Sequence, residues 1–309
     1  MLKEQDEMPT MRYPKLRYRN ERDGLVAHDA LVMCFYMRHP NEQLAPAVMR
    51  ALDLFRERIH PYRLVWCAGQ GQIDPLDDLE WERIRGETLD PGPDTAAFVL
   101  LWGDPVSLGG LHVDYRGLDV IPLPWPHRED DVSVLYLRLP TEYLEEQGPE
   151  RVRALALDVA AELPFNSGYV DFALCASPGE FEKAIHLIRP RYPGVHLAAS
   201  GAYLHMNTQV EGVHWMNFLG HPVLGALGGV ASLRERLALP GISLLEMSGD
   251  RVLITLGEHP ETGDVETGQT LPLHRALARL LEPHLAIRTR RIGLMSPEEM
   301  RRWERRFLD

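Results

Sequence analysis

Apolar residues along the chain follow two patterns, short runs typical of buried strands and longer segments with helical spacing. Residues 25–37 (LVAHDALVMCFYM) are rich in β-branched and aromatic side chains and predict a buried strand. Residues 39–60 follow with apolar side chains at helical spacing, and Asn41 is a suitable N-cap. Residues 62–69 (YRLVWCAG) predict a second strand. The first third of the chain is therefore expected to hold a strand, helix, strand unit.

The middle of the chain repeats this order. Residues 131–140 predict a strand, residues 142–163 carry apolar side chains on one helical face, and residues 168–177 predict the next strand. A further helix is expected to begin near Pro178, because proline suits the first helical turn. Two such units in series predict an α/β fold of the α+β kind, with mixed β-sheet layers and packed helices.

Shorter apolar runs complete this pattern. Residues 95–104 and 110–123 are expected to form adjacent, antiparallel strands. Residues 242–247 and 251–257 predict two further short strands, and residues 272–281 predict a helix. Because these elements are linked by short polar turns, we expect them to belong to the same fold.

No linker divides the chain cleanly into separate domains. We therefore expect one compact two-lobed unit over residues 25–309, with an N-lobe at about 25–130 and a C-lobe at about 131–309. Residues 1–24 alternate in charge and lack an apolar run, so they predict a flexible N-terminal arm.

Residues 212–237 (GVHWMNFLGHPVLGALGGVASLRERL) combine glycines with apolar residues. The glycines do not match the GxGxxG or GxxxxGK[ST] spacing of a phosphate-binding loop. Apolar residues instead fall on one face of a single helix that begins near Pro222. Within it, close packing of another element is expected at three glycines: Gly225, Gly228 and Gly229. A metal site formed by Glu211, His214 and His221 is an alternative.

The charge of the chain narrows the classes of partner. Lysine and arginine number 33 against 45 aspartates and glutamates, which gives a net charge of −12. Such a chain repels nucleic-acid phosphates and acidic membrane surfaces and suits a basic protein partner. Arginines near the C-terminus are interleaved with acidic residues, which favours internal ion pairs, and Ser296 and Glu299 predict a helical capping box there.

Cysteine usage and the absence of an apolar leader indicate a compartment. Cys34, Cys67 and Cys175 lie far apart within apolar runs and are expected to be buried, reduced thiols. The chain has no signal-peptide pattern and no run of about 18 apolar residues, so we expect no membrane association and a cytoplasmic location.

Catalytic motifs are not evident in the sequence. No GxSxG, HExxH or Cys/His signature occurs, so neither a catalytic residue nor a cofactor is predicted. One alternative is an enzyme or small-ligand-binding protein with a pocket near His205, Trp215, Asn217 and Asp264. A third hypothesis is a homodimer in which the glycine-bearing helix packs across the interface.

The C-terminal half carries a family resemblance. Residues 212–237 include a Trp-x-Asn-Phe-Leu-Gly segment and a Leu-Gly-Gly before a short Leu/Arg helix. Residues 250–285 (DRVLITLGEHPETGDVETGQTLPLHRALARLLEPHL) add Gly-Asp, Gly, Leu-Pro and Leu-Glu-Pro in that order. These segments resemble the type VI immunity family. The resemblance implies a non-enzymatic protein that binds and neutralises a toxic effector of a type VI secretion system.

An acidic segment is the best candidate for contact with such an effector. An effector that acts in the cytoplasm, such as a nuclease, would present a basic face that complements acidic residues. Our hypothesis is therefore that residues 74–90, with Trp81 as a candidate aromatic anchor, form part of the effector-binding face, and the alternative is an ordinary solvated loop. The assigned residues are Asp74, Asp77, Asp78, Glu80, Trp81 and Glu82.

Overall fold

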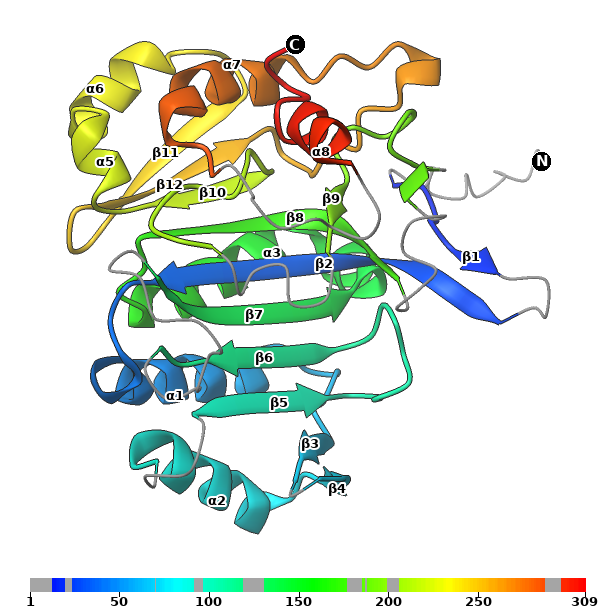
Figure 1. Ribbon diagram of the computed structural model, residues 1–309, viewed down its shortest axis with the longest axis vertical. Helices are drawn as coiled ribbons and strands as arrows, with labels where there is room; N and C mark the ends of the chain where they lie inside the picture. The colour runs from blue at the N-terminus through cyan, green and yellow to red at the C-terminus, as the bar shows by residue number, and fades with distance from the viewer. Residues whose placement is uncertain are drawn as a thin grey trace, which may run out of the picture.

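A computed structural model describes residues 13–19, 24–69, 71–91, 97–118, 131–176, 185–186, 188–198, 206–286 and 296–309. Twelve strands form one open sheet in the order β11-β12-β10-β8-β2-β7-β6-β5-β3-β4, with β1 paired to β2 and β9 paired to β8 (Figure 1). All pairs are antiparallel except β8 with β9. The fold is α+β, as the sequence predicted.

The strands are β1 (Tyr18–Arg19), β2 (Leu25–Met37), β3 (Trp66–Ala68), β4 (Ile73–Pro75), β5 (Phe98–Trp102), β6 (His112–Arg116), β7 (Ser133–Pro140), β8 (Ser167–Ala176), β9 (His196–Leu197), β10 (Met216–Leu219), β11 (Ile242–Met247) and β12 (Arg251–Leu256). The helices are α1 (Asn41–Arg58), α2 (Asp78–Leu89), α3 (Thr141–Glu162), α5 (Val223–Ala226), α6 (Gly229–Arg236), α7 (Pro272–Leu281) and α8 (Pro297–Glu304), with short 3-10 turns at Val265–Thr267 and Glu282–His284.

The two predicted strand, helix, strand units are present as β2-α1-β3 and β7-α3-β8. Within each unit the strands are not neighbours, because β2 lies between β7 and β8 while β7, β6 and β5 separate β2 from β3. This interleaving makes the sheet antiparallel although each helix connects strands that run the same way. The division into an N-lobe and a C-lobe stays a prediction, and the sheet itself runs continuously through both segments.

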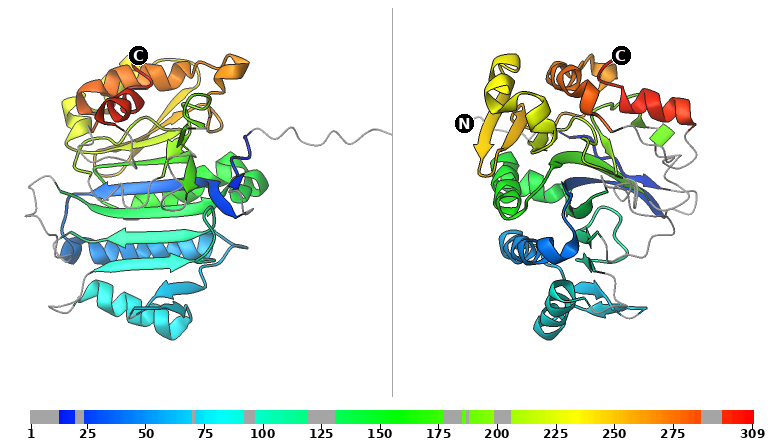
Figure 2. Two further views of the ribbon diagram at one scale, coloured as in Figure 1. Left: turned by 45° about the vertical axis from the view of Figure 1, so that its right-hand side comes forward. Right: turned by 60° about the vertical axis from the view of Figure 1, so that its left-hand side comes forward.

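Helices cover the two faces of the sheet unequally. Figure 2 shows α1, α2 and α3 together on one face, where Met33, Phe35 and Leu137 belong to the largest apolar core. A second core forms at the opposite end of the sheet, where β10 and β12 pack with α5, α6 and α7. A third, smaller cluster lies on the other face of β2, β7 and β8 around Cys34 and Tyr169.

Asn41 does not cap α1, contrary to the prediction. Pro40 takes the N-cap position and Asn41 is the first helical residue, buried at 1% exposure. Its side-chain oxygen accepts a hydrogen bond from the Tyr115 hydroxyl at 2.8 Å, and its nitrogen donates to the Thr88 carbonyl at 3.0 Å. The amide therefore joins β6 to the end of α2, a tertiary role that local sequence does not reveal.

The N-terminal arm is ordered over residues 13–19, which differs from the expected flexible segment. Tyr13 and Leu16 are buried, and the Tyr13 ring stacks on Phe172 with centroids 5.9 Å apart. Lys15 pairs with Glu145 at 2.7 Å. Apolar residues spaced by three within a charged stretch were sufficient to dock this segment.

The glycine-bearing segment forms two short helices and not the single predicted helix. Gly228 and Gly229 both have positive φ, at 86° and 77°, so the chain turns between α5 and α6. At Gly228 and Gly229 the predicted close approach of another element is wrong, because added Cβ atoms would meet at most Ser232, and these glycines supply backbone freedom instead. At Gly225 an added Cβ would lie 2.8 Å from the His221 ring, so a close contact is present there. Leu224, Leu227 and Leu233 are nevertheless buried as expected.

Other local predictions have mixed outcomes. The capping box of Ser296 and Glu299 is confirmed, and the three cysteines are buried and free. The predicted strand over 62–69 shortens to β3, and the segment after it, whose proline and glycine content predicts an exposed loop around a short helix, contains β4 and the 12-residue helix α2. The helix expected near Pro178 begins outside the described residues. Within the described part of the chain, no helix is long and apolar enough to span a membrane.

Two glycine-to-alanine substitutions should have opposite effects on stability. A Cβ at Gly168 in β8 would lie 2.7 Å from the Cys34 carbonyl oxygen, so the backbone must shift. We expect Gly168→Ala to lower the free energy of unfolding by about 1–3 kcal/mol. Gly86 lies inside α2 with no heavy atom within 4 Å of the added carbon, so Gly86→Ala should raise it by about 0.5–1 kcal/mol. Urea titration of each variant measures both changes, and a destabilised Gly86→Ala would contradict this account of α2.

Candidate functional site

The predicted acidic segment forms the start of α2 at the outer end of the sheet (Figure 1). Asp77 is the N-cap, and its side chain accepts a hydrogen bond from the Glu80 backbone nitrogen at 2.8 Å. Asp78 and Glu80 occupy the first turn, where acidic groups interact favourably with the helix dipole. The acidic residues that appeared to mark a loop therefore stabilise a helix N-terminus.

Trp81 is not an exposed anchor. Its side chain is only 4% exposed, and its indole nitrogen donates a hydrogen bond to Asp53 of α1 at 3.1 Å. The Arg56 guanidinium lies over the ring, 4.1 Å from its centroid. Helical periodicity places Trp81 on the same side as Ile84 and Thr88, the buried face of α2. This part of the predicted effector-binding set is corrected, because Trp81 holds α2 against α1.

Arginines on α2 neutralise part of its acidic charge. Arg83 pairs with Glu80 on one side and Glu87 on the other. Hydrogen bonding from Arg83 lowers the pKa of Glu80, so this carboxylate is already engaged. Arg85 pairs with Asp53 at 2.7 Å and more loosely with Glu82 at 3.4 Å.

The first turn of α2 keeps acidic groups available to a partner. Asp77 and Asp78 are exposed, and among the described residues neither lies within ion-pair distance of a cation. Asp74, on the neighbouring strand β4, accepts a hydrogen bond from Gln72 at 2.8 Å. Glu82 is exposed on the outer face of α2 one turn further along. These four carboxylates give this corner of the molecule a negative surface.

Leu79 is the apolar residue that sequence reasoning missed. It is 83% exposed on the outer face of α2, between Asp78 and Glu82. Val65 and Ile73, beside and within the adjoining strands, are 42% and 48% exposed. The signal was present in the spacing, since Leu79 is out of phase with the buried Trp81, Ile84 and Thr88. An exposed leucine among carboxylates has the layout of an interface centre with a polar rim.

The alternative pocket does not form from its described members. Trp215 and Asn217 are each 1% exposed, and Asn217 makes two hydrogen bonds to the backbone of His214. Asp264 is paired with Arg191 at 2.7 Å and caps a short 3-10 turn. His205 lies outside the described residues. Trp215 is packed in the main core, with its indole nitrogen buried and without a hydrogen-bond partner, while Asn217 and Asp264 are held by the contacts above. None of the three lines the cavity described next.

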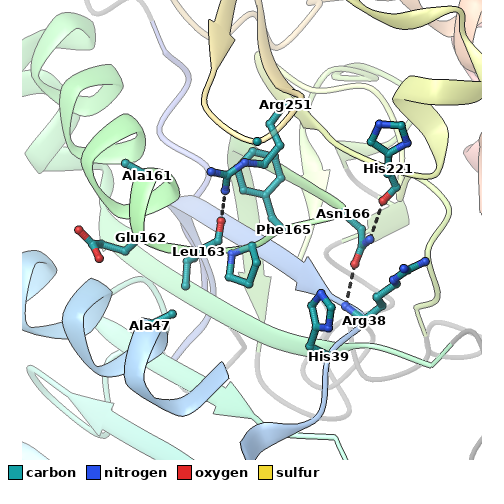
Figure 3. A pocket seen from close by; sticks show the side chains of 12 residues that line it. Arg38, His39, Ala47, Ala161, Glu162, Leu163, Phe165, Asn166, His221 and Arg251 are labelled. Atoms are coloured by element: carbon teal, nitrogen blue, oxygen red, sulfur yellow. Dashed lines mark hydrogen bonds between the residues drawn. The ribbon is translucent and has the colours of Figure 1, made fainter. Parts of the chain in front are cut away.

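A cavity of about 480 Å³ lies elsewhere, between α1, the end of α3 and the β11–β12 hairpin (Figure 3). The Arg251 guanidinium donates to the Leu163 carbonyl at the C-terminus of α3 and lies over the Phe165 ring. Asn166 accepts from the Arg38 backbone nitrogen at 2.7 Å and donates to the His221 carbonyl at 2.6 Å. These contacts tie chain segments together, and the lining contains no serine, threonine, cysteine or lysine that would act as a nucleophile.

Asp171 and His214 form a buried pair inside the fold. The carboxylate and the His214 Nδ1 are 3.0 Å apart, with both side chains at most 2% exposed. Burial raises the pKa of Asp171 and lowers the pKa of His214, and the Tyr169 ring stacks on the imidazole at 4.0 Å. No substrate reaches this pair from solvent, so we assign it to the core.

The described residues that the sequence suggested for metal or nucleic-acid binding do not form such a site. Among the described residues, no group of three histidines, cysteines or acids is arranged to hold a metal ion. In the C-terminal helix, Arg302 pairs with Glu298 at 3.2 Å and Arg305 with Glu282 at 2.9 Å. The described part of the arginine-rich end therefore makes the internal ion pairs that the sequence favoured.

Comparisons with known proteins agree with the resemblance found in the sequence. A solved structure described as Pseudomonas aeruginosa T6SS protein PA0821 shares the fold, with a TM-score of 0.73 and 21% identity over 94% of this chain and 87% of that chain. No curated protein matches the sequence. The model of the family TsiV, described as type VI immunity for VRR-NUC, matches residues 47–307. The chain therefore belongs to the TsiV family of type VI immunity proteins.

Proposed function

We propose that the chain neutralises a VRR-NUC nuclease effector by binding it directly through the corner formed by α2 and β4. The observation that carries this proposal is the family match over residues 47–307, whose description pairs the immunity protein with VRR-NUC. A nuclease binds a polyanion and so presents basic groups around its active site. The exposed carboxylates of Asp77, Asp78 and Glu82 complement such a face.

The anatomy of the corner supports a protein partner. Leu79 supplies an apolar centre that loses water on binding, while the acidic residues around it attract and orient the effector. The net charge of −12 strengthens the long-range attraction to a basic domain and disfavours direct binding of nucleic acid. We infer inhibition by binding without turnover, in the cytoplasm where a nuclease meets its substrate.

Co-expression tests the proposed function. We expect the reading frame beside the gene for this chain to encode a VRR-NUC protein that is toxic when expressed alone. Production of this chain should restore growth, and the two proteins should co-purify at 0.15 M salt. A neighbouring VRR-NUC protein that neither binds the chain nor is neutralised by it would refute the assignment of this partner.

Charge reversal on α2 should slow association. In the variant Asp78→Lys with Glu82→Lys, the attraction to a basic face becomes repulsion, so we expect the association rate to fall about tenfold at low salt and less at high salt. Because Asp78 interacts favourably with the α2 dipole and Glu82 pairs with Arg85, we expect the melting temperature to fall modestly, and thermal melting measures this separately from binding. Surface plasmon resonance measures the rates. The matched control, Glu235→Lys with Glu258→Lys, reverses two exposed charges at the far end of the sheet. It should lower the association rate less than the α2 variant does.

Truncation of the apolar centre should act on dissociation. Leu79→Ala removes the side chain that is 83% exposed in the free protein, and we expect an affinity loss of about 2 kcal/mol, or roughly thirtyfold, mostly as faster dissociation. Leu239→Ala, at a position 44% exposed near β11, is the control. Equal dissociation rates for the two variants would remove Leu79 from the interface.

A further inference from the structure

A row of large side chains crosses the outer end of the sheet on the face opposite α1 and α2. In the strand register, Pro75 of β4 lies opposite Trp66 of β3, and Trp66 lies opposite Trp102 of β5. Trp102 lies opposite His112 of β6, with the two rings stacked at 5.6 Å and an interplanar angle of 28°. The register therefore places these four side chains as direct cross-strand neighbours on one face, and within the row the printed ring contact joins Trp102 to His112.

Strand β5 is apolar on both faces, which is unusual for a sheet with one face towards water. Val99 and Leu101 point to the helix-covered face and are at most 1% exposed. By alternation, Phe98, Leu100 and Trp102 point to the other face, where Phe98 is 38% exposed. Strands with two apolar faces are typical of sheets covered on both sides.

No described helix covers this second face. Figure 1 shows α1 behind β5 and β6 and α2 beyond β5 at the end of the sheet, while the near face of these strands carries no described helix. Trp66, Trp102 and His112 are each only partly buried. The row is therefore an apolar surface that a partner can contact.

The groups beside the row leave its centre uncharged. Burial, with Arg138 and Arg116 nearby, lowers the pKa of His112 to about 3, so the imidazole is neutral. Arg138 donates to the Gly110 carbonyl at 2.8 Å, and Arg116 pairs with Asp114 at 2.7 Å. Both guanidiniums are thus held by their neighbours.

The acidic corner adjoins the exposed end of the row. Pro75 is followed by Asp77, which begins the turn into α2, and Trp102 is followed by the exposed Asp104. Edge strand β4 ends at Pro75, in the row, and leads into α2 at Asp78, so one partner can contact both around this edge. Carboxylates next to partly exposed indoles select a cationic side chain, because the indole face attracts cations and the acids add charge attraction.

We propose that Trp66 and Trp102 form a platform that receives an arginine or lysine side chain of the effector. This inference rests on the proposed function and extends the interface from α2 to the open face of the sheet. Arginine fits best, since its planar guanidinium stacks on aromatic rings while its edge donates to carboxylates. The charge of the corner argues against a nucleic-acid base as the stacked group, because its phosphates would lie beside Asp77 and Asp104.

Leucine substitutions test the platform with the cognate VRR-NUC protein in a catalytically inactive form. Trp66→Leu and Trp102→Leu keep apolar area but remove the ring, and we expect each to raise the Kd about fivefold to tenfold. Trp66→Phe should lie between wild type and Trp66→Leu. Leu245→Ala, at an exposed apolar position on the opposite edge strand, should match wild type. Thermal melting checks that each variant folds. If Trp102→Leu has a lowered melting temperature, the affinities of Trp66→Leu and Trp66→Phe are used to judge the platform.

A double-mutant cycle distinguishes stacking of an effector cation on the indole from general packing against it. Each exposed arginine and lysine of the effector is changed to methionine and combined with Trp66→Leu, and we expect one cation to show about fivefold coupling. Wild-type affinity in both leucine variants, or coupling to no cation, would overturn the platform while leaving the α2 interface standing. A dimer of this chain that Trp66→Leu dissociates would assign the face to a second copy. If the wild-type chain does not bind the effector at all, both this inference and the proposed function are overturned.

Discussion

Strand β2 is the constraint on which the rest of the structure depends. It pairs with β7 along one edge and with β8 along the other, from Ala30 to Tyr36 on both sides, and its side chains are fully buried over this stretch. Backbone groups buried this deeply must all be hydrogen-bonded, so both partner strands have to be in register for water to be excluded from the centre of the sheet. Because β7 and β8 are joined by α3, closing them around β2 also fixes that helix against α1. The pattern of buried side chains allows only one register for β2, and the apolar cores form around this centre.

Elements with strong local signals could be predicted from the sequence, and elements set by tertiary contact could not. The capping box at Ser296 depends only on neighbouring residues, so its pattern was sufficient. Asn41 has an equally good local pattern for capping, yet the Tyr115 hydroxyl and the Thr88 carbonyl take its side chain. The three residues of β4 carry no periodicity of their own, and pairing with β3 is what makes them a strand. Gly228 and Gly229 read as part of a helix because apolar spacing continues through them, although their backbone ends it.

The candidate site shows the same division between composition and geometry. Net charge and the run of acids directed attention to a segment that remains the proposed effector-binding surface, because charge is a property of the residues wherever they point. The choice of Trp81 as an anchor failed because enrichment of tryptophan at interfaces says nothing about which side of a helix a residue occupies. Trp81 and Leu79 are two residues apart, so a helix must direct them to different faces, and burial of the larger ring against Asp53 and Arg56 leaves the leucine outside. The pocket near Trp215 failed for a related reason, since Asn217 is already engaged by the backbone of His214 and Asp264 by Arg191, and Trp215 is buried in the core.

The order of strands in the sheet also explains why one end of the molecule keeps an apolar face without a described helix over it. The chain after β8 returns repeatedly over one end of the sheet, where α5, α6 and α7 supply the second core. No later segment among the described residues returns to β3, β4 and β5, so only α1 and α2 cover that end, and they cover one face. Apolar groups left there would favour self-association in a neutral protein, but surrounding carboxylates make two copies repel one another. The same charge attracts a basic partner. Acidity at this corner therefore keeps an exposed apolar surface soluble and at the same time selects what is able to cover it.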